Sequence, residues 1–126
     1  MSTPVSPDIT SEDGSAWVKM KAGGRPAHLN IELKNSSDTD LKVTRMWSRD
    51  FDSIEVAESV ISDEGAKMVR YAEFTIPAKG VIWMGGKTKI VLEKEKHIIT
   101  MDLTISFAFF LSDGTVFEID APVRLT

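Results

Sequence analysis

Apolar residues recur at every second position in several short segments of this chain. Between residues 27 and 34, Leu29, Ile31 and Leu33 alternate with polar residues. A period of two sends successive side chains to opposite faces, so this segment is predicted to be a half-buried antiparallel β-strand. The longest alternation, over residues 99–109, predicts a second such strand near the end of the chain.

Other short segments are also rich in apolar residues and are separated by sequences typical of turns. They predict strands at residues 41–47, 54–61, 67–71, 72–76, 81–84, 89–92 and 117–121. Ser-Asp-Glu-Gly and Ser-Asp-Gly-Thr separate four of these apolar segments, and glycine adopts the positive φ of a hairpin turn at little cost. No segment keeps a helical period over three turns. We therefore predict an all-β fold, a Greek-key β-sandwich of the immunoglobulin-like or cupredoxin-like kind.

The length of 126 residues suits one domain. Residues 1–14 are rich in Ser, Thr, Pro and acidic residues, and with so little apolar surface to bury they are predicted to be a flexible tail. Residues 15–126 are predicted to form a single sandwich domain. The first residues also lack the basic and apolar regions of a signal peptide, which leaves the compartment open.

Composition excludes several classes of function. The net charge of −4 argues against a nucleic-acid partner, because phosphate contacts need a concentrated basic face. The longest apolar run, residues 107–111, is far shorter than the roughly 20 residues that a membrane helix needs. The chain has no cysteine, which excludes disulfides, thiolate nucleophiles and cysteine-bound metals. It also lacks the common hydrolase, phosphate-loop and zinc-protease motifs, so we expect no enzyme activity.

Several segments, in order, resemble the periplasmic copper chaperone PCuAC family, also called DUF461. The opening AWVKMKAGGRPAHLNIELKN, at residues 16–35, is similar to the beginning of that domain, with its Ala-Trp pair and its Gly-Gly turn. FTIPAKG at residues 74–80 is similar to the family's Ile-Pro-Ala-Gly turn, and DGTVFEIDAPVR at residues 113–124 to its closing strand. The resemblance implies a cupredoxin-like sandwich, export to the periplasm or cell surface, and copper delivery toward cytochrome oxidase assembly proteins.

The same resemblance implies a copper(I) site, made by a His-x-Met pair, a single Met on the next strand and a second His-x-Met pair. Imidazole and thioether groups are soft ligands that suit copper(I). In this chain other residues hold these positions: Ala57 and Ser59 for the first pair, Met68 or Val69 for the single Met, and Thr88 with Ile90, or Ile90 with Leu92, for the second pair. Met68 is the one family ligand that can remain, so the inherited site is predicted to be degenerate.

Two other constellations are candidates for binding. His97 and Met101 would share a face of a regular strand and could form an alternative metal pair, although Met101 could equally be core filler. Trp47 and Trp83 could form a partner or ligand surface, because Trp is enriched at such surfaces, or they could close the ends of the sandwich. His28 is expected to be a solvated histidine on a polar strand face.

Two hypotheses follow for the function. The first is an exported, PCuAC-like copper-handling protein with a degenerate copper site, with copper(I) implied as cargo by the resemblance alone. The alternative is a metal-free β-sandwich of the same descent that acts as a protein-interaction module and has no cofactor.

Overall fold

The chain folds into β-strands throughout. The computed structural model describes residues 3–12, 14–20, 27–96, 99–100 and 103–125, and in these residues it contains eleven strands and no helix. The strands are β1 (Ile9–Ser11), β2 (Trp17–Met20), β3 (Ala27–Asn35), β4 (Leu41–Trp47), β5 (Phe51–Ser62), β6 (Gly65–Tyr71), β7 (Phe74–Ile76), β8 (Val81–Met84), β9 (Thr88–Glu95), β10 (Thr104–Leu111) and β11 (Val116–Leu125). The all-β prediction is confirmed.

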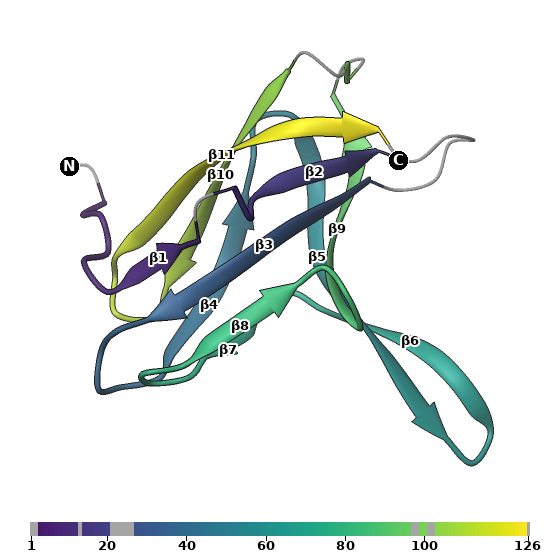
Figure 1. Cartoon of the computed structure of the whole chain (residues 1–126), viewed down its shortest axis with the longest axis horizontal. Coiled ribbons are helices and arrows are strands. Elements are labelled where there is room, and N and C mark those ends of the chain that lie inside the picture. Colours follow the sequence, from purple (N-terminus) through teal and green to yellow (C-terminus); the bar gives the residue numbers. More distant parts are fainter. Residues whose placement is uncertain (1–2, 13, 21–26, 97–98, 101–102, 126) are drawn as a thin grey trace.

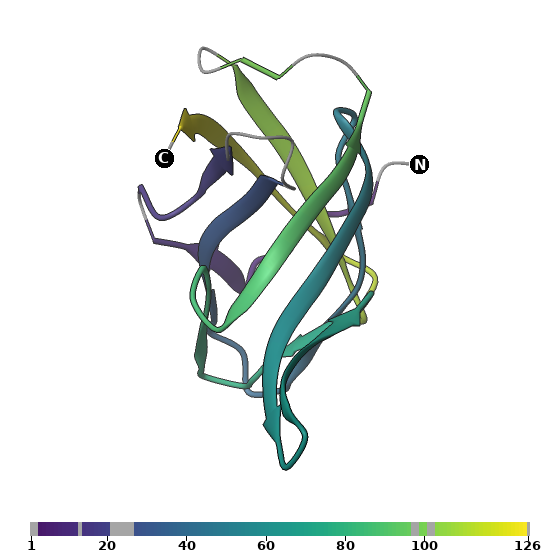
Figure 2. The same cartoon turned by 90° about the vertical axis from the view of Figure 1, so that its right-hand side faces the viewer.

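The strands form one continuous mixed sheet that curves back on itself. Their order is β6-β5-β9-β3-β2-β11-β10-β4-β7, and β1 and β8 also pair with β3. The pairing of β2 with β11 is parallel, with Val18 opposite Val123, and it joins two antiparallel parts. Strands β4 and β5 lie near opposite ends of this order but follow each other in the chain, so the sheet turns back on itself and two layers face each other across the core (Figures 1 and 2).

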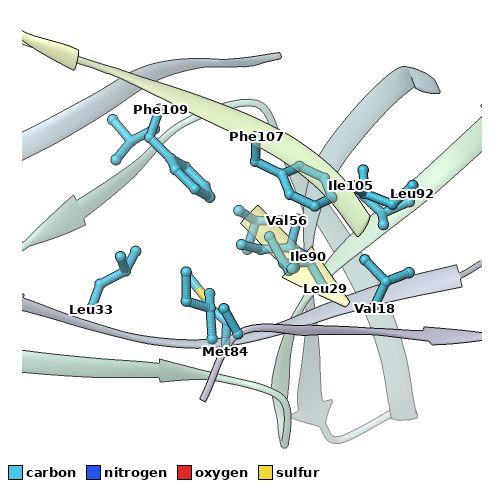
Figure 3. Packing of buried hydrophobic residues seen from close by; sticks show 14 of the residues in the cluster. Val18, Leu29, Leu33, Val56, Met84, Ile90, Leu92, Ile105, Phe107 and Phe109 are labelled. Carbon is cyan, nitrogen blue, oxygen red and sulfur yellow. The ribbon is translucent and has the colours of Figure 1, made fainter. Parts of the chain in front are cut away.

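Both layers contribute side chains to one hydrophobic core (Figure 3). In β3, Leu29, Ile31 and Leu33 are fully buried, as their alternation predicts. From the facing layer, Phe107 and Phe109 of β10 point into the same interior. Burial of each large apolar side chain contributes roughly 1.5–3 kcal/mol of transfer free energy. The side chains that point inward therefore make the largest contribution to the stability of the sandwich.

A two-stranded arm extends from the sandwich. Strand β5 pairs with β9 only as far as Glu58, opposite Thr88, while its pairing with β6 continues to Ser62. The remaining part of the hairpin projects away from the other strands (Figures 1 and 2). It turns at Gly65, whose φ of 108° favours glycine. We call the segment of residues 59–69 the β5–β6 arm.

Two differences from the sequence-based expectation concern the predicted tail and the strand predicted over residues 99–109. Part of the segment predicted as a flexible tail over residues 1–14 forms β1, in which Ile9 lies opposite Asn35 and is only 3% exposed. The edge of β3 supplies the partner for this short strand, and a bridge from Val5 to Val116 and the buried Ser6 also hold the segment against the sandwich. The strand predicted to start at Ile99 instead starts at Thr104, after the non-strand residues Ile99 and Thr100.

Candidate functional site

The positions predicted to match the family's first ligand pair and its single methionine lie on neighbouring strands. In the β5–β6 ladder Ser59 is directly opposite Met68, and Ala57 is opposite Arg70. Directly opposed residues of an antiparallel pair point to the same face, and so do residues two apart on one strand. Ala57, Ser59 and Met68 therefore share one face. We call it the outer face, because Val56, the residue before Ala57, points to the other side of the sheet and is buried in the core.

The second ligand pair does not join them. Thr88 lies opposite Glu58, and Ile90 lies opposite Val56, so both positions belong to the core-facing side of the sheet. Ile90 and Leu92 are fully buried. Neither assignment of this pair therefore directs a side chain toward Ser59 and Met68, and the five predicted ligand positions are divided between two faces of the same three strands.

The chemistry of the shared outer face does not fit a tight copper(I) site. Its one thioether belongs to Met68, which is 53% exposed, and Ser59 Oγ lies 3.5 Å from Met68 Sδ, to which it donates a hydrogen bond. A serine hydroxyl is a hard oxygen donor, and the methyl group of Ala57 cannot bind a metal. In the part of the chain that the structure describes, no three His, Cys, Asp or Glu residues come together as metal ligands.

Charged side chains occupy the rest of this face. Arg70 forms an ion pair with Glu93 of β9, and its Nη1 also lies 3.8 Å from Glu55 Oε1. On the opposite side of Ala57 the register places Lys89. Arginine and protonated lysine donate hydrogen bonds but have no lone pair to give to a metal. The two positions that flank Ala57 therefore cannot replace the missing imidazole.

The alternative pair, His97 and Met101, lies outside the described residues. Its expected pairing required a regular strand through Ile99, and Ile99 and Thr100 are not in a strand. The reason given for placing the two side chains on one face is therefore wrong, and a metal role for them stays a prediction.

The two tryptophans are exposed, and they line different hollows. Trp83 is 56% exposed and borders a hollow of about 350 Å³ together with Phe74, Ile82 and Met84. Its indole lies close to Gly86, where an added Cβ would be 3.0 Å from Trp83 Cζ3. Trp47 is 48% exposed and borders a separate hollow of about 270 Å³ with Phe110 and Val116. The structure therefore does not combine them into one surface.

One constellation was not singled out from the sequence. A small hollow of about 40 Å³ on the outer face is lined by residues of β2, β3 and β9 and the turn after β8: Lys19, His28, Asn30, Gly85 and Lys89. We call it the outer hollow. The sequence did show that these polar residues alternate with core residues and so point outward. It did not show that their strands lie side by side, because that depends on long-range pairing.

Comparison with known proteins connects this geometry to a family. A family model described as "Putative lipoprotein LpqE-like" matches residues 13–123. The chain belongs to the LpqE-like family. Members of this PCuAC-type family are generally non-catalytic, which agrees with the absence of catalytic motifs from the sequence. No curated protein matches this LpqE-like chain.

Solved PCuAC domains share the fold of the LpqE-like chain. The copper-bound PCuAC domain from PmoF2 superposes with a TM-score of 0.75 at 19% identity, over 100% of both chains. The apo PmoF2 PCuAC domain gives 0.76 at 18% identity, over 98% of this chain and 94% of that one. The apo PCuAC domain from PmoF1 gives 0.72 at 17% identity, over 94% and 95%. The resemblance to PCuAC proteins expected from the sequence is thus confirmed for family and fold.

Proposed function

We propose that this protein is an exported, non-catalytic member of the copper-handling PCuAC group in which the inherited copper site has degenerated. Copper(I) is at most a weakly held cargo, bound through the thioether of Met68. The observation that carries this proposal is the pairing of Met68 with Ser59, because neither Ser59 nor the next pair on this face, Ala57 and Arg70, offers a second soft donor. A single thioether that is half exposed to water cannot supply the coordination that soft ligands give a cuprous ion.

Three further observations support the setting. The family description names lipoproteins, which are exported proteins. Copper binding is stated for the PmoF2 domain, whose fold this chain shares. Within the described part of the chain, no helix is long and apolar enough to cross a membrane. A role toward cytochrome oxidase assembly proteins follows from the family resemblance and remains part of the proposal.

Competition for copper(I) against a chromogenic chelator tests the proposal. We expect the wild-type protein to withdraw little copper(I) from the chelator, and Met68→Leu to abolish what remains. Met46→Leu is the matched control, because Met46 is a partly buried core side chain on β4, away from the outer face. Tight binding that survives in Met68→Leu and is lost in His97→Ala would contradict the proposal and assign the metal to His97 and Met101.

The alternative function, a metal-free protein-interaction module, is favoured by a different observation. The β5–β6 arm and the strand end beside it carry large exposed apolar side chains: Ile61 is 80% exposed, Met68 53% and Tyr71 41%. Arms of this kind present both side chains and an unpaired strand edge to a partner.

The two functions are separated by one binding experiment on a purified cytochrome oxidase assembly protein from the same source. Under the interaction hypothesis, an Ile61→Ser/Tyr71→Ser variant loses binding whether or not copper is present, while Met68→Leu binds nearly as well as wild type. Binding that requires copper(I) would favour the copper-handling function instead.

A further inference from the structure

The outer hollow gathers basic side chains from three strands by register. Leu29 of β3 lies opposite Val18 of β2 on one side and opposite Ile90 of β9 on the other, and all three are fully buried. Their sequence neighbours Lys19, His28 and Lys89 must therefore point to the opposite, outer face. Lys19 is directly opposite His28 in the β2–β3 ladder, and all three side chains line the hollow.

Neither lysine has an ion-pair partner in the part of the chain that the structure describes, although both side chains are partly buried rather than extended into solvent. The acidic group nearest along β3 is Glu32, which lies opposite Trp83 and does not line the hollow. Two lysine side chains that line one space in a protein of net charge −4 indicate a site for an anion.

The walls of the hollow are built from tightly fitted groups. Asn30 is held by a hydrogen bond of 2.9 Å from its Nδ2 to the carbonyl oxygen of Ser15. Its Oδ1 lies so close to Gly85 that an added Cβ would be 1.8 Å away, so any larger residue at this position would displace the Asn30 side chain. The turn after β8 therefore packs against Asn30, beside Lys89, and forms one wall of the hollow.

We propose that the outer hollow binds a small oxyanion of the phosphate class through the ammonium groups of Lys19 and Lys89, with His28 at its edge. The volume of about 40 Å³ exceeds that of one water molecule and has room for a single small polar group only. Lysine donates charge-assisted hydrogen bonds to phosphate oxygens. Metal cations do not fit, because the lysines have no lone pair to offer. The phosphate can be free in solution or part of a lipid headgroup, and the chemistry is the same.

The test is a titration of the full chain with inorganic phosphate, followed by the backbone amide signals of residues 19, 28 and 89 in nuclear magnetic resonance spectra. We expect saturable shifts at these residues in the wild-type protein. Lys19→Gln and Lys89→Gln should each raise the Kd about tenfold or more, because each removes a charge-assisted hydrogen bond. Lys89→Arg should retain most of the affinity, since it keeps the charge.

Lys67→Gln is the matched control, because it removes the same charge from an exposed lysine on β6. Equal loss of affinity in Lys67→Gln, or shifts that never saturate, would overturn the proposal by showing only general charge attraction. Vesicles of phosphatidylglycerol, compared with phosphatidylcholine vesicles, separate the two sources. Binding to phosphatidylglycerol that is lost in Lys19→Gln and Lys89→Gln assigns the headgroup, and binding of inorganic phosphate alone assigns the free anion.

Discussion

Replacing Asn35 with alanine should destabilise the sandwich more than any other single polar substitution in β3. Asn35 is the last residue of this strand and is fully buried. Its Nδ2 donates to the carbonyl oxygens of Thr39 at 2.9 Å and of Ile76 at 3.0 Å. Its Oδ1 accepts from the backbone nitrogen of Ser37 at 2.9 Å and from Ser37 Oγ at 2.7 Å. One side chain thus connects β3, the following turn and β7.

The magnitude follows from where each bond lies. The Ile76 carbonyl is in the buried environment, and a buried acceptor left without a partner costs about 1–3 kcal/mol. The bonds to Thr39 and Ser37 lie nearer the surface, where water can replace part of their energy, and together they contribute about 1 kcal/mol. We therefore expect Asn35→Ala to lower the free energy of unfolding by about 3 kcal/mol.

Urea denaturation followed by tryptophan fluorescence measures this loss. Asn30→Ala is the control, because Asn30 is only partly buried and makes one hydrogen bond from its side chain, to the carbonyl of Ser15. It should cost about 1 kcal/mol. A loss in Asn35→Ala no larger than that in Asn30→Ala would refute the reasoning, since it would mean that water reaches the Ile76 carbonyl when the amide is removed.

Three further predictions concern the core and the outer face. Phe109→Ala should cost about 3–5 kcal/mol of unfolding free energy, because the ring is 1% exposed at the centre of the core, and thermal denaturation at matched conditions checks this value. Arg70→Ala should cost less than about 1 kcal/mol, because its ion pair with Glu93 is partly exposed to solvent; a larger loss in urea denaturation would show that the ion pair is structurally important. Ser59→His combined with Arg70→Met should raise copper(I) affinity in the chelator competition, because both positions share the outer face with Met68; no gain over wild type would show that the backbone there has also lost the geometry for copper.

Strands with a regular alternation were predictable from the sequence alone. The segment 41–47 forms a strand with the predicted bounds, and the alternation of Leu29, Ile31 and Leu33 marks the buried face of β3. The reason is that local spacing decides which side chains a strand can bury. The glycine of the Ser-Asp-Gly-Thr turn, Gly114, has the expected positive φ of 87°.

Features that depend on distant partners could not be predicted. Strand β1 exists because the edge of β3 accepts it, and nothing in the polar segment around Ile9 indicates that edge. Alternation alone placed Ile99 in a strand, although the ladder to β11 begins only at Thr104.

The candidate site, too, was predictable from the sequence only in part. The resemblance to the family assigned residues to its ligand positions from the sequence alone, and from them we predicted a loss of donors. It could not tell which of them share a face, because that depends on how β5 pairs with both β6 and β9. The outer hollow was missed for the same reason: Lys19, His28 and Lys89 are far apart in the chain and meet only through the pairing of three strands.

A crystal of the protein soaked with cuprous ion, with the copper located by anomalous scattering, tests most directly whether the fold has been kept while its copper ligands have been lost. We expect no well-occupied copper on the outer face, or a weakly occupied one that contacts Met68 alone. A fully occupied copper held by three or more protein donors between the segments 57–59 and 87–92 would contradict it.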